Sequence, residues 1–155
     1  MNFLKKYFTN IGPRPYFKKH FKINKFLVAE ELKYLSAGKK NHNKIFFIIN
    51  RSPGAGLFSN LTFVLNQLKF CEEKRFIPII DMENFTTIYN EREKINNSFN
   101  SWDYYFEKIN NYNIKDVYKS SNIIFSNSKF QKKMPIDIQS KELNNAFKMI
   151  KIKKK

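Results

Sequence analysis

The sequence has little of several features, and each shortage excludes a class of protein. Its one cysteine, Cys71, excludes an internal disulfide bond, and its place on an apolar helical stripe favours a buried core position over a nucleophile. No apolar run approaches the roughly 18 residues of a membrane-spanning helix. The first residues, MNFLKKYF, lack the apolar segment and the cleavage site of a signal peptide. We therefore expect a cytoplasmic protein, with the inner face of the membrane as a second place where it can act.

Short catalytic and metal-binding motifs are also missing. The sequence has no GxxxxGKS/T nucleotide loop, no HExxH, no pair of cysteines and no G-x-S-x-G nucleophile elbow. His20 and His42 each stand alone, so we give neither a metal-binding nor a catalytic role. Asp81-Met82-Glu83 resembles the acid-x-acid metal motif of some sugar-nucleotide enzymes, but an ordinary turn after a strand explains it equally well.

The charge is strongly positive but unevenly placed. The formal net charge is +16, from 29 basic and 13 acidic residues, yet only four of the basic residues are arginine. Specific nucleic-acid recognition favours arginine, whose planar group makes paired hydrogen bonds to phosphates and base edges. Residues 1–40 carry ten basic residues against two acidic ones, whereas residues 50–110 carry seven against eight. We expect no specific nucleic-acid partner; a solvated face, peripheral contact with an anionic membrane surface and an A/T-rich genome all remain compatible with the charge.

The stretch from Lys44 to Asp81 has the pattern of a strand, a glycine loop, a helix and a second strand. Five consecutive apolar residues, Ile45–Ile49, are typical of a strand that is buried on both faces of a parallel sheet. A second β-rich run, Phe76–Ile80, ends at an acid. Between them an apolar stripe recurs at helical spacing, formed by Leu57, Leu61, Val64, Leu65, Leu68 and Cys71. The sequence therefore predicts an α/β fold built on a βαβ unit.

The loop after the first strand is the first candidate site. Ligands of open α/β sheets bind at the carboxyl ends of the strands, where free backbone N–H groups and the helix dipole favour a phosphate. Gly54 and Gly56 allow a close backbone approach, and Arg51 can reach an anionic ligand. Ser59 and Asn60 can cap the helix or bond a sugar hydroxyl or a phosphate oxygen. The glycines equally fit a tight turn without a ligand, so both interpretations stay open.

The remaining elements are predicted from similar patterns. Residues 1–43 form a basic, mostly helical amino-terminal segment, residues 44–150 the α/β domain and residues 151–155 a solvated Lys-rich tail. Within these parts we expect a helix over 16–36 that ends near Gly38, a short helix over 102–109 capped by Ser101, a helical turn at 114–119, a strand at 122–125 and a helix over 140–150.

Three segments together resemble a known family. They are P-G-A-G-L-F-S-N-L-T-F-V-L-N-Q-L at Pro53–Leu68, I-P-I-I-D at Ile77–Asp81 and N-S-W-D-Y-Y-F-E-K-I at Asn100–Ile109, with Tyr89 between the last two. In this order and spacing they resemble bacterial glycosyltransferase-like proteins related to the fucosyltransferases. The resemblance covers about residues 44–110, which is less than half of the chain.

The resemblance implies a Rossmann-like three-layer α/β/α domain with a short, mostly parallel sheet, like the amino-terminal half of a GT-B glycosyltransferase. It implies a nucleotide-sugar donor such as GDP-fucose, a glycan or lipopolysaccharide acceptor, a place in polysaccharide biosynthesis and no metal cofactor. In the related enzymes a second domain holds most of the donor diphosphate through an Arg-containing motif, and the roughly 45 residues after position 110 are too few for it. We therefore expect a half that is truncated or inactive, whose exposed sheet edge favours self-association.

The same resemblance implies where a substrate would bind. The loop and the first helical turn would line the cleft, and Asp81, Glu83 or Glu107 would orient sugar hydroxyls, although the pattern does not identify a catalytic base. Trp102 and Glu107 fit a purely structural role as well. The expected substrate-binding residues are Arg51, Gly54, Ala55, Gly56, Leu57, Phe58, Ser59, Asn60 and Trp102.

Two other functions fit parts of the sequence. One is a basic module without catalysis that binds RNA or an anionic membrane surface, in line with the charge of the flanks. The other is a dinucleotide-dependent enzyme, because Gly54 and Gly56 match two of the three glycines of GxGxxG and Asp81 lies where a ribose-binding acid would lie. Ser59 stands at the third glycine position, which weakens the dinucleotide interpretation.

Overall fold

The predicted βαβ unit forms the centre of the molecule in a computed structural model, which describes residues 12–13, 33–50, 56–125 and 148–153. Strand β3 (Phe46–Ile49) is buried along its whole length, helix α3 (Leu57–Lys74) follows it, and strand β4 (Ile77–Ile80) pairs with β3 in parallel. Because both faces of β3 are covered, every one of its side chains is apolar. The predicted strand, helix and strand are confirmed.

Two more strands complete a four-stranded sheet of order β2-β6-β3-β4. Strand β6 (Ile123–Phe125), at the place of the strand predicted over 122–125, pairs with β3 in parallel. Strand β2 (Lys33–Leu35) pairs with β6 in the antiparallel direction. A separate antiparallel pair joins β1 (Gly12–Pro13) to β5 (Phe85–Thr86). The chain is therefore of the mixed α/β class that the sequence predicts, with a small, mostly parallel sheet.

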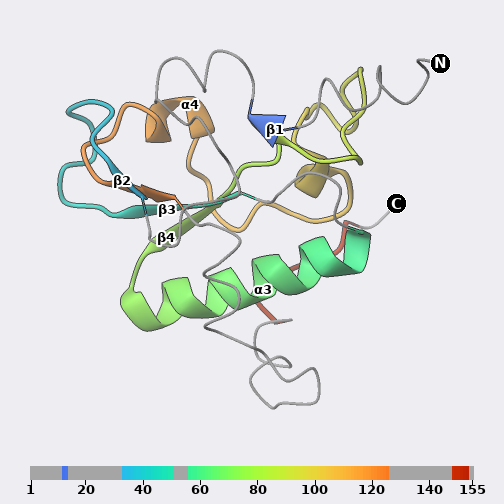
Figure 1. Cartoon of the computed structure of the whole chain (residues 1–155), viewed down its shortest axis with the longest axis horizontal. Helices are drawn as coiled ribbons and strands as arrows, with labels where there is room; N and C mark the ends of the chain where they lie inside the picture. The colour runs from blue at the N-terminus through green and yellow to red at the C-terminus, as the bar shows by residue number, and fades with distance from the viewer. Residues whose placement is uncertain (1–11, 14–32, 51–55, 126–147, 154–155) are drawn as a thin grey trace.

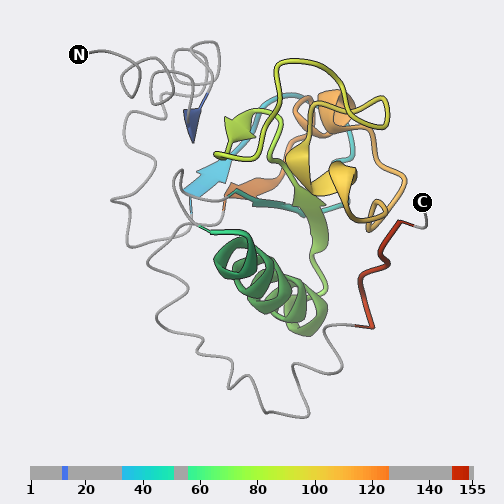
Figure 2. The same cartoon turned by 90° about the vertical axis from the view of Figure 1, so that its right-hand side faces the viewer.

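The side chains of β3 alternate between the two faces of the sheet. Phe47 and Ile49 pack in one apolar cluster with the buried face of α3, whereas Phe46 and Ile48 pack in a second cluster with Val117 of helix α4 (Ile114–Val117). Figure 1 shows α3 below the sheet and α4 above it, and the turned view of Figure 2 agrees. Cys71 lies on the buried side of α3 with 1% of its surface exposed, and burial raises the pKa of its thiol, so the predicted core role is confirmed.

The predicted helix over 16–36 is wrong at its end. Residues 33–35 form strand β2, because their backbone pairs with β6; residues 16–32 lie outside the described residues. Gly38 does not cap a helix there but lies against the chain at Lys119, where an added Cβ would come within 2.2 Å of the main-chain oxygen. A helical pattern of apolar residues was therefore overridden by sheet pairing, and a close backbone approach explains the glycine.

The segment after β4 also differs from its prediction. Instead of a helix over 102–109, a 3-10 helix, η1 (Ser101–Tyr104), ends after one turn. The cap is Asn100 rather than Ser101, since the Asn100 side chain accepts a hydrogen bond from the main-chain N–H of Trp102. The helical turn predicted at 114–119 is confirmed as α4.

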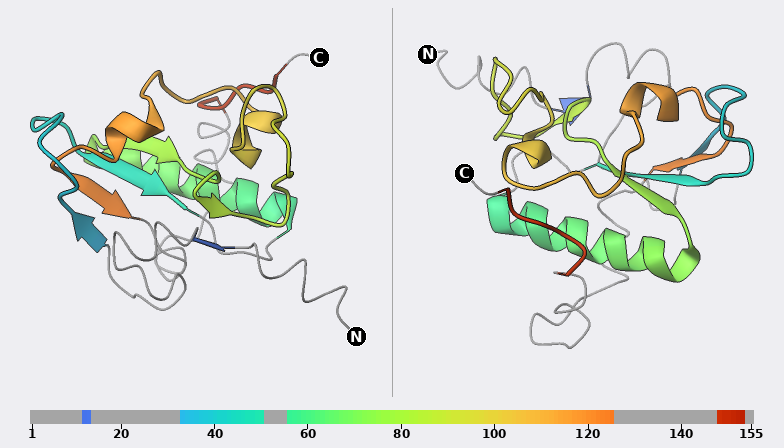
Figure 3. Two further views of the ribbon diagram at one scale, coloured as in Figure 1. Left: turned by 90° about the horizontal axis from the view of Figure 1, so that it is seen from above. Right: turned by 180° about the vertical axis from the view of Figure 1, so that it is seen from behind.

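Part of the predicted Lys-rich tail pairs through its main chain with another segment of the protein. Lys148 and Met149 form a turn rather than the end of the helix predicted over 140–150, whose residues 140–147 lie outside the described residues. Lys151 and Lys153 then pair through their main chains with Glu107 and Tyr105, around a bridge between Phe106 and Ile152. Figure 3 shows this segment, in red, passing beside α3. Within the described part of the chain, no helix is both long and apolar enough to cross a membrane.

Candidate functional site

The loop predicted to bind a ligand is described only at its helical end. Arg51, Gly54 and Ala55 lie outside the described residues. Gly56 is the N-cap of α3, in an extended conformation, so a glycine rather than Ser59 or Asn60 holds the capping position. Leu57, Phe58 and Ser59 are exposed with Gly56, whereas Asn60 is buried.

Three of the predicted substrate-binding residues meet beside this helix end. Leu57 and Asn60 of α3 and Trp102 of η1 line a common cavity, and Tyr89 lines it as well. Its volume of about 20 Å³ corresponds to the space of roughly one water molecule, which is too small for a sugar or a nucleotide. The resemblance therefore brought together residues that are neighbours in the fold, but the described part of this helix end encloses no space for a substrate.

Asp81 is held by the protein itself. Its carboxylate is fully buried after β4 and accepts hydrogen bonds from the hydroxyl of Tyr118 at 2.5 Å and from the main-chain N–H of Asn84 at 2.8 Å. The Asn84 side-chain amide donates to the same carboxylate at 3.0 Å. Burial raises the pKa of Asp81, and these donors partly offset that shift. The pKa of Tyr118 is also raised, by burial and then by the neighbouring carboxylate.

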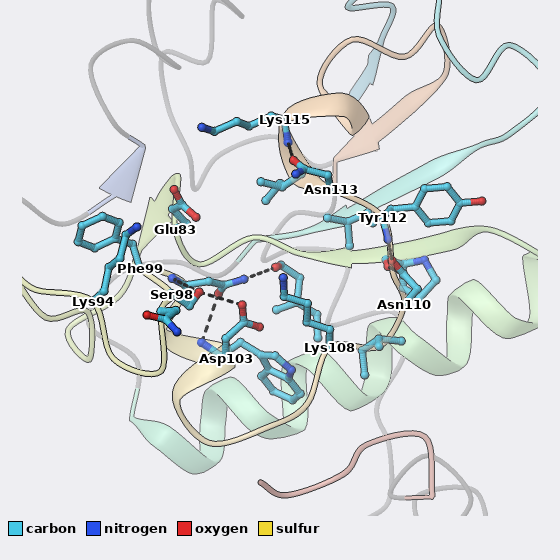
Figure 4. A pocket seen from close by; sticks show the side chains of 18 residues that line it. Glu83, Lys94, Ser98, Phe99, Asp103, Lys108, Asn110, Tyr112, Asn113 and Lys115 are labelled. Atoms are coloured by element: carbon cyan, nitrogen blue, oxygen red, sulfur yellow. Dashed lines mark hydrogen bonds between the residues drawn. The ribbon is translucent and has the colours of Figure 1, made fainter.

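A larger cavity lies along the outer edge of β4. Its volume is about 380 Å³, within the usual size range of small-molecule sites. The side chains that Figure 4 labels come from the turn after β4, from η1 and the loop before it, from the segment that leads into α4 and from α4 itself. The lining contains Pro78, Ile79, Ile80, Glu83, Lys94, Asn97, Ser98, Phe99, Asn100, Trp102, Asp103, Lys108, Ile109, Asn110, Tyr112, Asn113, Ile114 and Lys115.

Two asparagine side chains in the lining of this cavity bind the outer edge of β4. The side-chain amide of Asn110 donates to the main-chain oxygen of Pro78 at 2.6 Å, and that of Asn100 donates to Ile80 at 2.8 Å. Pro78 has no N–H to offer, as expected for a residue on an edge strand. Because these carbonyls are occupied, the outer edge of β4 is not a free row of acceptors for another strand. Self-association through a sheet edge stays a prediction.

Asp103 brings a carboxylate into this cavity. It is 6% exposed, and its Oδ2 accepts a hydrogen bond from the Ser98 hydroxyl at 2.9 Å. No residue that the structure describes donates a hydrogen bond to its other oxygen, Oδ1. The ammonium group of Lys153 donates a hydrogen bond to the main-chain oxygen of Asp103. The cavity thus contains a nearly buried carboxylate with unused acceptor capacity.

The three predicted acids end in three different places. Glu83 lines the cavity along β4, Asp81 is buried directly after β4, and Glu107 is exposed where the carboxyl-terminal segment pairs with it. Among the described residues no three His, Cys, Asp or Glu side chains gather closely enough to hold a metal ion. Glu83 lines the cavity of about 380 Å³ along β4, whereas Glu107 lines a second hollow, of about 620 Å³, with residues 151–153 of the carboxyl-terminal segment.

Sequence reasoning missed most of the lining of this cavity. Trp102 and Glu83 were identified, but Asp103 is not among the acids that the resemblance implies, and Asn100 and Asn110 were given no role. One signal was available: asparagine recurs throughout residues 84–113, and asparagine side chains both cap turns and bind backbone edges. Nothing in the spacing indicated which of them would meet the edge of β4.

Comparison of the chain with protein-family models, with curated proteins and with solved structures gives no match.

Proposed function

We propose that this chain is a glycosyltransferase-like domain with the Rossmann-like three-layer architecture of the amino-terminal half of a GT-B enzyme. It transfers, or formerly transferred, a sugar such as fucose from a nucleotide-sugar donor to a glycan or lipopolysaccharide acceptor. One observation carries the proposal: the segment N-S-W-D-Y-Y-F-E-K-I, which resembles the family, contributes five of its residues to a cavity beside a parallel βαβ sheet, namely Asn100, Trp102, Asp103, Lys108 and Ile109.

The chemistry of the lining supports a sugar. Sugar hydroxyls both donate and accept hydrogen bonds, and the cavity offers carboxylates, amides and ammonium groups that can answer both. The resemblance assigns the donor diphosphate mainly to a second domain, so this cavity is proposed to hold the acceptor sugar. Glu83 is then the acid placed to take the proton of the attacking hydroxyl, and the leaving diphosphate would be stabilised by cations and helix N-termini.

The binding test is a thermal-shift series on the full chain with methyl glucoside as a simple acceptor sugar and with GDP, GDP-fucose, NADH and AMP. We expect methyl glucoside to raise the melting temperature, because a ligand that binds only the folded state stabilises it. A rise with NADH alone would favour the dinucleotide enzyme and contradict the proposal. Binding to random RNA that falls steeply with salt, without any response to sugars, would favour the basic module instead.

The catalytic test replaces the acid of the cavity. If sugar transfer from GDP-fucose is measurable, we expect Glu83→Gln to lower kcat by about 100-fold or more while leaving sugar binding in place, as loss of a general base does. Glu93→Gln is the matched control, because Glu93 is exposed and lies outside the cavity. Equal activity of the two variants would remove Glu83 from the mechanism.

A further inference from the structure

The cavity along β4 is lined by charges of both signs, and its three lysines form no ion pair with any residue that the structure describes. Lys108 and Lys115 make no ion pair with the described residues, and Lys94 lies over the ring of Phe99 at 5.6 Å rather than beside an acid. In the view of Figure 4, Lys108 extends between Asp103 and Asn110. Elsewhere in the described chain lysines do find carboxylates, as in Lys40–Asp116 at 2.9 Å and Lys69–Glu73 at 3.8 Å.

The combination of groups limits the class of ligand. A simple anion would be attracted by three lysines, but the carboxylates of Asp103 and Glu83 would repel it. A simple cation would suit Asp103, but the three lysines would repel it. A ligand that carries hydroxyl groups beside one anionic group satisfies both, since the hydroxyls donate to Asp103 Oδ1 and the anion pairs with the lysines. A volume of about 380 Å³ is small for a chain of sugars, which favours a single ring.

We propose that this cavity binds a glycosyl unit that carries an anionic group, either a carboxylate or a phosphate. The inference rests on the proposed function and deepens it, because it names the class of sugar. Asp103 anchors the hydroxyls, while Lys108 and Lys115 select the charge. A uronic acid of an acceptor glycan and a sugar phosphate share this chemistry, and they are separated by experiment.

The experiment is ligand-observed NMR titration of the full chain with methyl glucoside, glucuronate, glucose 1-phosphate and inorganic phosphate. We expect one of the two acidic sugars to bind about three- to tenfold tighter than the neutral sugar in low salt, with the advantage shrinking in high salt. Tighter binding of glucuronate identifies a carboxylate as the anion, and tighter binding of glucose 1-phosphate identifies a phosphate. Inorganic phosphate alone should bind more weakly than either acidic sugar.

Two variants assign the binding to the cavity. Lys108→Gln should remove most of the preference for the acidic sugar and leave the affinity for methyl glucoside unchanged, with Lys119→Gln as the control outside the cavity. Asp103→Asn should lower the affinity for all three sugars by about tenfold, and Asp116→Asn, outside the cavity, is its control. Because Lys108 is exposed, we expect Lys108→Gln to fold normally. It therefore still tests the inference if Asp103→Asn fails to fold.

The outcomes separate this inference from the proposed function. If neutral and acidic sugars bind with equal affinity, and Asp103→Asn abolishes the binding of both, the selection for charge is overturned. The cavity would then still be a sugar-binding site. Binding of inorganic phosphate as tight as that of glucose 1-phosphate, unaffected by Asp103→Asn, would overturn the inference in favour of simple anion binding. Absence of binding by every sugar would overturn the inference and count against the function as well.

Discussion

Two aspartates near the edge strand β4 are both buried, yet the protein treats them differently. Asp81 follows the strand and receives donors from Tyr118 and from both nitrogens of Asn84. Asp103 lies in η1, receives one side-chain donor, from Ser98, and faces a cavity. The comparison teaches that burial of an acid does not identify a site. The number of donors that the fold supplies separates a structural carboxylate from one with capacity left for a ligand.

The largest expected effect breaks the network of Asp81. Tyr118→Phe removes the hydroxyl that donates to the carboxylate and leaves a buried charge with fewer donors. We expect a loss of about 1.5–3 kcal/mol in the free energy of unfolding, the usual range for a hydrogen bond to a charged group. That corresponds to a fall of roughly 4–10 °C in melting temperature for a chain of this size. Chemical denaturation of the two proteins at pH 7 measures it.

The control for this variant is Tyr112→Phe. Tyr112 is half-buried, and no described residue bonds its hydroxyl, so its loss should change the free energy of unfolding little. If both variants lose the same amount, the cost reflects a general effect of removing a hydroxyl, and the special status of Asp81 in the comparison is wrong.

The second effect is a pH dependence, also at Asp81. The pKa of this carboxyl is raised in the folded state, so the folded protein holds the proton to higher pH than the unfolded chain, whose value is about 3.9. The stability that this tighter proton binding contributes is fully present below the unfolded pKa and is lost as pH rises through the folded pKa. Asp81→Asn carries no such charge. We therefore expect its stability relative to the natural protein to improve above pH 4, by up to about 1.4 kcal/mol per pH unit.

Asp116 provides a control of opposite sign. Its pKa is lowered by the hydrogen bond and the charge of Lys40, so its contribution is present above the unfolded pKa and is lost as pH falls through the folded pKa. Asp116→Asn should therefore lose stability relative to the natural protein as pH rises toward the unfolded pKa of about 3.9, and the difference should level off at higher pH. Denaturation curves from pH 3 to 8 compare the variants, and the same sign for both would contradict the burial-based account of Asp81.

The sequence predicted the parts of the fold that local pattern controls. The apolar run of β3, the helical stripe of α3 and the strand that ends at Asp81 each carry their own signal, and all three are confirmed. Strand β2 was read as the end of a helix because three residues are too few for a periodic pattern. Its pairing with β6, some 90 residues later in the chain, is a tertiary effect that overrides local propensity.

The candidate site was predicted less well than the fold, for a related reason. The glycine loop drew attention because its signal is local, whereas the cavity forms between β4 and residues that follow it by up to about 35 positions. Asn100 and Asn110 reach the carbonyls of Ile80 and Pro78 only once the chain has turned back along the strand. Side chains that act on a distant backbone edge leave no period or motif in the sequence, so Trp102 was identified from resemblance alone.

The smallest expected effect tests the other half of the comparison. Ser98→Ala removes the one side-chain donor of Asp103, and we expect a loss of less than about 1 kcal/mol in the free energy of unfolding. The reason is the cavity: water that enters it can replace the serine hydroxyl, which no solvent can do at the fully enclosed carboxylate of Asp81. Chemical denaturation of Ser98→Ala beside Ser36→Ala, an exposed serine outside the cavity, measures the difference. A loss as large as that of Tyr118→Phe would mean that Asp103 depends on the protein as fully as Asp81 does, and the distinction between a structural and an available carboxylate would fail.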